Sequence, residues 1–359
     1  MSNKGRGLCG TDLLHERNMK LHGERYKRNR EADEKNVLRY MGRSARKVSS
    51  SSIITIPVVV HVVYNTEVEN ISDEQILSQI NRLNKDFRRT NEDIVKVPDV
   101  WKNLASDTKI QFKLACKDPE GNPTRGITRI KTQRIVFEIP DDESQPEPIK
   151  FANKGGKDAW DTTRYLNIWV CNLTDRLLGY AQFPAGPPST DGVAISHWAF
   201  GDMGSASAPN NPFGTQFNMG RTATHEIGHY LDCYHIWGDD GWLQNPCSGT
   251  DNVVDTPPQR GSNGDKPSFP DLTEKCDDTG PSGTMWMNYM DYTDDDHMYM
   301  FTVGQSVRMH AALNGSRASL LESDVLVCPI EEAELSKVML LPSEVFDGGN
   351  KKVPVEEIL

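Results

Sequence analysis

Residues 225–235 read HEIGHYLDCYH and place three histidines beside a glutamate. His225 and His229 are four residues apart, so they lie on one face if this stretch is helical. His235 follows at a distance that a turn can span. Three neutral imidazoles with an open fourth position for water are the ligands of a catalytic zinc ion. Glu226 stands between the first two histidines, so we expect it to take a proton from that water.

Asp232 stands where the chain must leave the predicted helix before His235. Motifs of this kind usually have glycine there, because the backbone takes a left-handed conformation. Aspartate tolerates that conformation better than most other residues. We therefore expect a left-handed Asp232, with His225, His229 and His235 as zinc ligands.

A methionine-containing turn follows about fifty residues later, in MNYMDYTDDDHMYMF at residues 287–301. A three-histidine zinc motif followed by such a turn is the metzincin pattern. The pattern predicts Met290 as an apolar floor beneath the metal. Tyr292 is placed to donate a hydrogen bond to the oxyanion that forms when water attacks a peptide carbonyl.

The elements that must position these residues are both strands and helices. Apolar runs predict strands at residues 53–64, 110–116 and 165–171, and further strand segments at 178–183 and 191–196. His61, inside the first run, is predicted to be a packed strand residue. Ser72 and Gln75 predict a capping box for a helix through Phe87. The active-site helix is predicted to begin near Met219, and residues 303–322 are predicted to be helical. Residues 121–129 and the polar loop at 139–148 are predicted to be exposed turns.

The strand segments just before the zinc helix are well placed to form the rim of a substrate cleft. An extended peptide pairs with such a rim as an added strand. Gly179, Tyr180 and Ala181 are the candidates for that edge. An ordinary core hairpin is the alternative.

The N-terminal 48 residues form a basic arm with 13 Lys/Arg and 6 Asp/Glu, whereas the whole chain has a net charge of −11. This asymmetry predicts that the arm docks on the body, and it argues against nucleic acid as a partner. Residues 11–41 are predicted to be helical, and residues 43–52 to be a linker where cleavage near Arg43 or Arg46 releases the arm. Cys9 is a candidate for a thiolate that caps the zinc and keeps the enzyme latent, with Asp12 as another candidate ligand. A cysteine without a role is the alternative.

Seven cysteines leave at least one outside an intramolecular disulfide. Cys247 and Cys276 flank a loop rich in Gly, Pro and Asp and are the expected disulfide. Cys116 and Cys171 lie in apolar strand-like runs and are predicted to be buried thiols.

The acidic loop at residues 238–259 is short of apolar residues and rich in turns. Calcium prefers carboxylate and carbonyl oxygens on such a loop. Asp251, Asp255 and Thr256 are the calcium candidates, and a solvated acidic loop is the alternative.

Three parts are predicted: a pro-segment at 1–48, a catalytic domain at 49–322 and a loose tail at 323–359. The chain has no apolar run of transmembrane length, and its start has no apolar signal-peptide core. It also has no phosphate loop and no dinucleotide fingerprint. We expect protein or peptide substrates, no nucleic acid, no membrane span, a monomer and an extracellular location.

The chain resembles the pappalysin family of metzincin zinc peptidases, the ulilysin-like group. The resemblance covers residues 53–320 and includes PVVVHVVYN, GITR, KGGKDAWDTTRYLNIWVCNL, LLGYAQFP, the HEIGH…H motif, WGDD, DNVVDTP and NYMDYTDDDHMYMFTVGQ. The CGTD start resembles the family's latency segment. The resemblance implies an α/β (α+β) metzincin-type domain with a twisted, mostly parallel sheet, an active-site helix and an irregular lower half. It also implies His225, His229 and His235 as zinc ligands, Glu226 as general base, Met290 as the Met-turn residue and Tyr292 as transition-state support.

Two residues depart from the family pattern. Asp232 replaces the usual glycine, and His297 stands where relatives often have cysteine, which puts the family's second disulfide in doubt. We interpret His297 as a surface residue or a support to the site. Asp295 follows the Met-turn near the expected pocket for the residue after the scissile bond. A carboxylate there favours Arg or Lys in the substrate.

The leading hypothesis is a secreted zinc endopeptidase made as a latent precursor. One alternative is a catalytically silent protein that binds metal or peptide, with Cys9 as a permanent cap. Glu226 counts against it, because a binding protein needs no base. A zinc amidase or esterase is the other alternative, and the long cleft with its edge strand favours peptides instead.

Overall fold

The computed structural model describes residues 9–44, 52–142, 145–174, 177–204, 211–238 and 247–328. Most of the predicted linker at 43–52, part of the acidic loop and the predicted tail beyond residue 328 lie outside these ranges. Among the described helices, none combines the length and apolar character that crossing a bilayer requires.

A six-stranded, mostly parallel sheet forms the centre of the body. Its longest strand, β1 (Ile54–Tyr64), pairs in parallel with β2 (Ile110–Leu114) along its first half and β3 (Ile127–Lys131) along its second half. On its other side lie β4 (Leu166–Cys171), then β6 (Val193–Ser196), then the antiparallel edge strand β5 (Gly179–Ala181). A strand covered on both faces reads as a continuous apolar run, and the side chains of β1 from Ile56 to Val63 are all buried.

The prediction of exposed turns at 121–129 was wrong at its end, because β3 begins at Ile127. This strand is only partly buried, so its sequence ITRIK has two apolar residues and no strong pattern. Gly126, with φ of +67°, leads into it. A Cβ at this position would lie 2.8 Å from the backbone nitrogen of Ala115, so only glycine fits.

The described part of the body has three α-helices, and two of them, α2 and α3, pack against strands of the sheet. The helix α2 (Asp73–Phe87) is capped by Ser72, whose side chain accepts from the Gln75 backbone. The predicted capping box is only half formed, because the Gln75 amide donates to the carbonyls of His197 and Phe200 instead. The active-site helix α3 is Arg221–Tyr230, and α4 is Val303–Leu313. The predicted helix at 303–322 therefore breaks after Leu313 and resumes as a short 3-10 turn, η8 (Ala318–Glu322).

The remaining short 3-10 turns are η2 (Glu92–Lys96), η3 (Pro148–Lys150), η4 (Ala152–Lys154), η5 (Pro188–Thr190), η6 (His197–Ala199) and η7 (Asp295–His297).

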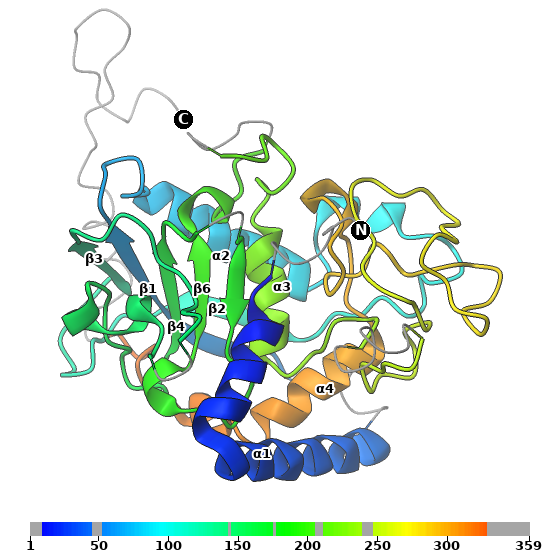
Figure 1. Cartoon of the computed structure of the whole chain (residues 1–359), viewed down its shortest axis with the longest axis horizontal. Helices are drawn as coiled ribbons and strands as arrows, with labels where there is room; N and C mark the ends of the chain where they lie inside the picture. The colour runs from blue at the N-terminus through cyan, green and yellow to red at the C-terminus, as the bar shows by residue number, and fades with distance from the viewer. Residues whose placement is uncertain are drawn as a thin grey trace, which may run out of the picture.

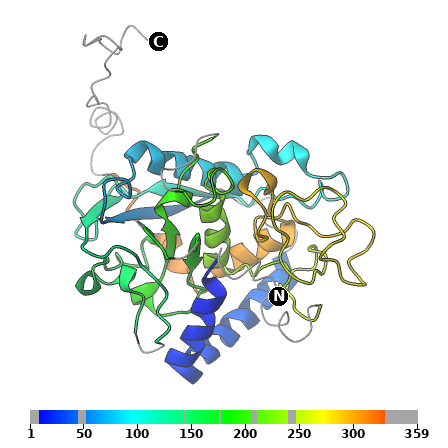
Figure 2. The ribbon, with the colours of Figure 1, turned by 45° about the horizontal axis from the view of Figure 1, so that its top comes forward.

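The N-terminal arm is one bent helix, α1 (Thr11–Ser44), with a kink at Gly23, where φ is +51°. Figures 1 and 2 show its two segments in dark blue and blue, the first leading from the edge of the sheet and the second lying along α4. Buried side chains recur along the second segment at helical spacing, at Tyr26, Arg30, Asp33 and Val37. One face of the helix therefore packs on the body.

Residues 247–302 lie on the far side of α3 from the sheet, as loops with only η7 among them (Figure 1). A disulfide joins Cys247 and Cys276 within this segment. The backbone there is held by turns and by side-chain hydrogen bonds.

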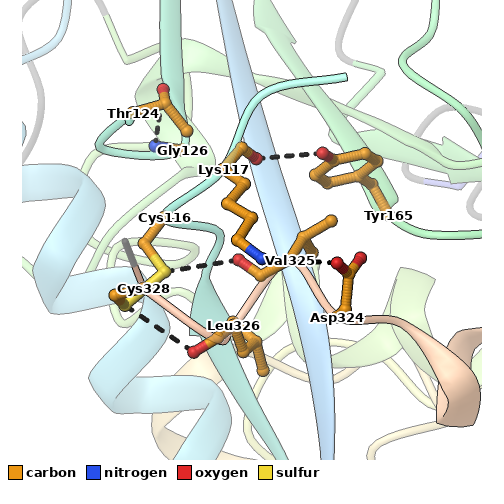
Figure 3. The surroundings of a disulfide bond; sticks show 9 residues. All are labelled: Cys116, Lys117, Thr124, Gly126, Tyr165, Asp324, Val325, Leu326 and Cys328. Carbon is orange, nitrogen blue, oxygen red and sulfur yellow. Dashed lines mark hydrogen bonds and ion pairs between the residues drawn. A yellow bond between two sulfur atoms is a disulfide. The ribbon is translucent and has the colours of Figure 1, made fainter. Parts of the chain in front are cut away.

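A second disulfide joins Cys116 to Cys328, so the prediction of a buried Cys116 thiol was wrong (Figure 3). The carbonyl of Val325 accepts from the backbone N–H groups of Cys116 and Lys117. Residues 323–328, which we predicted as the start of a loose tail, are thus attached to the body. The two cysteines are 212 residues apart, and no local pattern indicates such a pairing. Cys171 is a buried free thiol, as predicted.

Candidate active site

Three imidazoles converge at the middle of the molecule. The Nε2 atoms of His225, His229 and His235 lie 3.1 to 3.3 Å from one another. Zinc–nitrogen bonds of about 2.0–2.1 Å in a tetrahedral site place two ligand nitrogens about 3.3 Å apart. The observed spacing therefore fits a zinc ion at the centre of the three rings.

The outer nitrogens of two of the three rings, His225 and His229, explain why a cation would fit there. Nδ1 of His225 lies 2.7 Å from the Tyr289 carbonyl, and Nδ1 of His229 lies 2.8 Å from the Cys233 carbonyl. A ring that donates from Nδ1 keeps an unprotonated Nε2. Burial lowers the pKa of His225 to about 3 and the pKa of His229 well below its ordinary value, which keeps both rings neutral. Neutral rings aim their lone pairs at one point, and a metal ion relieves that repulsion.

The helix α3 meets the methionine turn at Gly228. A Cβ at this position would lie 2.4 Å from the Met290 sulfur, so the glycine of HEIGH allows the turn to pack directly beneath the helix. Met290 is fully buried, and its carbonyl accepts from the Ile236 backbone. Met290 thus packs against the helix that carries His225 and His229, and its role as an apolar floor beneath the metal stays a prediction.

Asp232 ends the active-site helix with a left-handed backbone, at φ of +74°. This turn brings His235 back toward the other two rings. The ring of Trp237 stacks on His235 at 4.4 Å between centroids. Tyr292 lies 5.0 Å from the His235 ring and 5.6 Å from the His225 ring, so its side chain borders the cage.

Glu226 is buried beside the cage and contacts the N-terminal arm. Its Oε2 accepts a hydrogen bond from the Thr11 hydroxyl at 2.9 Å, and the Cys9 thiol lies 3.5 Å from the same atom. Burial raises the pKa of Glu226 to about 7, while the hydrogen bonds from Thr11 and Cys9 lower it.

Cys9 and Asp12 approach the cage differently. The Cys9 sulfur and one nitrogen from each of the three histidines all lie within 4.8 Å of one another. The Asp12 carboxylate lies 3.3 Å from Nδ1 of His235, on the outer side of that ring. The Cys9 sulfur therefore lies in one group with the three imidazoles, whereas Asp12 contacts His235 from outside that group. Cys9 as the fourth zinc ligand stays a prediction.

The arm also occupies the edge of the sheet at β5. Cys9 forms a parallel bridge with Gly179, and the Gly10 backbone donates to the Gly179 carbonyl at 2.9 Å. The Ala181 backbone donates to the Thr11 hydroxyl at 2.9 Å. The side chain of Tyr180 is buried in the opposite layer. The arm therefore binds the backbone of the strand at which we expected a substrate to pair.

A cavity extends from Glu226 toward the methionine turn, and its lining includes Phe217, Met298, Tyr292 and Asp295. The Asp295 carboxylate accepts from the backbone of Met219 at 2.8 Å, before the start of α3. Burial raises the pKa of Asp295 to about 7. A carboxylate thus borders this cavity at the N-terminal end of the active-site helix.

The calcium candidates hold loops together in this structure. Asp251 accepts from the Thr256 hydroxyl at 2.8 Å and from the Val253 backbone at 3.0 Å. Asp255 accepts from the Thr302 hydroxyl and the Gly304 backbone at the start of α4. These contacts leave calcium binding at Asp251, Asp255 and Thr256 as a prediction.

Sequence reasoning missed two sets of arm contacts. Thr11 bridges Glu226 and the edge strand. It was missed because only Cys9 and Asp12 beside it were considered as candidate ligands. Arg30 and Glu34 contact Asp232 and Arg308, more than 200 residues away. The only sequence signal for these contacts was Asp232 itself, because a carboxylate at a buried turn needs a cationic partner.

Known proteins match both the sequence and this geometry. Residues 152–314 match the profile of the peptidase family M43, described as pregnancy-associated plasma protein-A. An extracellular metalloprotease of Arthroderma benhamiae is 30% identical over 268 residues, covering 74% of this chain and 79% of that protein. A mutant of Tannerella forsythia promirolysin is 46% identical with a TM-score of 0.76, covering 90% of this chain and 99% of that one. Mature mirolysin in complex with a cleaved peptide is 51% identical with a TM-score of 0.68, covering 76% and 96%.

The fold and the metal-binding cage thus define a metalloendopeptidase of the metzincin type. The chain belongs to the pappalysin family of metallopeptidases.

Proposed function

We propose that the chain is a latent zinc endopeptidase in which Glu226 is the general base. The observation that supports this most strongly is the position of Glu226, which is buried beside three convergent imidazoles and hydrogen-bonded by Thr11 of the arm. The same carboxylate that would activate water is covered by the segment that would keep the enzyme silent.

His225, His229 and His235 would hold the zinc ion, which supplies Lewis acidity and lowers the pKa of water when bound. Glu226 takes the proton of the attacking water and passes it to the leaving amine. Tyr292 donates a hydrogen bond to the carbonyl oxygen as that atom gains negative charge. An extended substrate pairs with the backbone of Gly179 and Ala181, which the arm occupies in the precursor.

Latency follows from the arm, residues 1–48, with Cys9 as the fourth zinc ligand. Asp295 gives the cavity beyond Glu226 a preference for Arg or Lys next to the scissile bond. We further propose that the protein is exported, acts as a monomer and binds calcium at the loop of Asp251, Asp255 and Thr256.

The test is a time course of the full-length chain with zinc and calcium, followed by intact mass and casein cleavage. The wild type is expected to lose residues up to about 43–48 and then to cleave casein. The Glu226→Ala variant is expected to stay whole and to lose at least a hundredfold in casein turnover after its arm is removed by an Arg-specific protease, since general-base catalysis contributes about 10²- to 10⁴-fold.

Bound zinc, measured by elemental analysis, separates loss of the base from loss of the metal. Glu226→Ala should keep its zinc, whereas His229→Ala should lose it. The exposed Glu120→Ala variant serves as the matched control and should behave as wild type. Casein cleavage by Glu226→Ala at the wild-type rate would contradict the proposal.

A further inference from the structure

The guanidinium of Arg30 contacts four groups that belong to the catalytic body. It donates to Oδ1 of Asp232 at 2.9 Å, to the Tyr234 hydroxyl at 2.9 Å and to the Pro184 carbonyl at 3.2 Å. Its carbon lies 5.1 Å from the centre of the Phe183 ring. Arg30 is 6% exposed, and the arm's own Asp33 also accepts from it at 3.2 Å, so the body supplies one side of a buried arginine pocket.

The acceptor of this pocket is also bound by a residue of the body. Asp232 is fully buried, and its Oδ2 accepts from Arg308 of α4 at 2.9 Å. Arg308 also donates to the Asp232 carbonyl, and on its other side it donates to the arm's Glu34. The body thus supplies the donor that holds Oδ2, while Oδ1 accepts from Arg30. The left-handed backbone of Asp232 belongs to the turn between His229 and His235.

The pocket lies next to the metal cage, at the opposite end of α3 from Asp295. The Phe183 ring is 5.5 Å from the ring of His229 and also covers the Arg30 guanidinium. Phe183 lies two residues past the end of the edge strand β5, where we place an extended substrate. Asp295 lies at the start of the active-site helix, whereas Asp232 lies just past its end. A peptide that spans the cleft would pass both carboxylates.

We propose that, once the arm is removed, this pocket becomes a subsite for an arginine of the substrate, on the side of the scissile bond away from Asp295. The inference rests on the proposed peptidase function. Arginine fits better than lysine, because a planar guanidinium can stack on Phe183 while it donates to Asp232 and Tyr234 together. In the precursor, Arg30 fills the subsite with the chain's own arginine.

The experiment uses full-length protein activated by an Arg-specific protease, with the released arm removed by gel filtration. A series of peptides carries Arg, Lys or Gln at each successive position on the N-terminal side of the scissile bond. One position is expected to favour Arg over Gln by about tenfold in kcat/KM, as a charge-assisted hydrogen bond predicts, with Lys between them.

The variants identify the source of that preference. Asp232→Asn, which tolerates the left-handed turn, should abolish the preference for Arg, and Tyr234→Phe should reduce it. The exposed Asp277→Asn variant carries the same charge change and should keep the preference. A preference that survives both Asp232→Asn and Tyr234→Phe would overturn the subsite, as would equal rates for Arg and Gln at every position.

A binding measurement keeps this result separate from the proposed function. Activated Glu226→Ala protein is titrated with the labelled Arg and Gln peptides, and fluorescence anisotropy is followed. Tighter binding of the Arg peptide supports the subsite. If the activated wild type then cleaves no peptide, that failure counts against the peptidase function alone. Cleavage of both peptides with equal binding would count against the subsite alone.

Discussion

The two sides of the active-site helix are held together by different means. On one side, β1, β4 and β6 pair in parallel through long ladders of backbone hydrogen bonds, and their side chains fill apolar layers on both faces. On the other side, residues 247–302 form loops, and individual buried side chains hold them in place (Figure 1). The three predicted zinc ligands lie on α3 and the turn after it, between these two regions.

This difference decides how each side responds to change. A ladder distributes its energy over many similar contacts, whereas a loop depends on a few hydrogen bonds that cannot be replaced. Asn288 and Gln305 illustrate the second case, because each side-chain amide donates to the other at 2.9 Å. We expect single polar substitutions to damage the loop side more than the sheet side.

The largest effect is expected for Asp291→Ala. The Asp291 carboxylate is fully buried and accepts four hydrogen bonds, from the backbone and side chain of Asn263, from Gln259 and from the Tyr292 backbone. Its removal leaves four buried donors without an acceptor, at a cost of about 4 kcal/mol in the free energy of unfolding. Urea denaturation of the full-length chain measures this loss.

Asp296→Ala is the matched control. Asp296 is five residues from Asp291 in the sequence, and its carboxylate lies at the surface of the loop. If Asp291→Ala lowers the free energy of unfolding no more than Asp296→Ala does, the loop does not depend on its buried carboxylate. That result would contradict the proposed difference between the loop side and the sheet side.

The same contrast explains what the sequence predicted and what it did not. Strand β1 was predicted because eight of its eleven residues are apolar, and α3 because two histidines four apart lie on one face of a helix. Asp291 was not predicted, because its partner Asn263 is 28 residues away and belongs to no periodic element. The arm's Arg30 and its acceptor Asp232 are 202 residues apart, so their contact was equally hidden. Contacts made one at a time over long separations leave no repeating pattern.

A smaller effect is expected for the disulfide on the loop side. The bond between Cys247 and Cys276 closes a separation of 29 residues, and the double change to serine should cost about 3.6 kcal/mol by the loop-entropy relation. Limited proteolysis should then cut residues 247–276 several times faster. The double serine variant of Cys116 and Cys328, whose bond lies beside β2, should leave the rate of cutting in that segment unchanged. Equal acceleration in both variants would mean that the loop side is not an independently held region.

The smallest effect is expected from a titration on the sheet side. His61 of β1 is fully buried, with Nδ1 2.7 Å from the Thr128 hydroxyl and Nε2 3.0 Å from Oδ1 of Asn167. Burial lowers the pKa of His61 to about 4, so the folded chain holds this ring neutral while the unfolded chain protonates it near pH 6.5. The resulting stability is present above pH 6.5 and is lost as the pH falls toward 4.

At pH 5.5 this loss amounts to about 1.4 kcal/mol relative to pH 8. Urea denaturation of wild type and His61→Gln at pH 8 and pH 5.5 measures this loss. From pH 8 to pH 5.5, the unfolding free energy of the variant should fall by about 1.4 kcal/mol less than that of the wild type, whatever its stability at pH 8. His22, exposed on the arm, provides the control as His22→Gln, which should keep the wild-type pH dependence. Many backbone contacts of β1 surround His61. Protonation of its ring should therefore lower the free energy of unfolding gradually, without unfolding the strand. A cooperative loss of the sheet near pH 6 would show that this side also depends on single polar contacts.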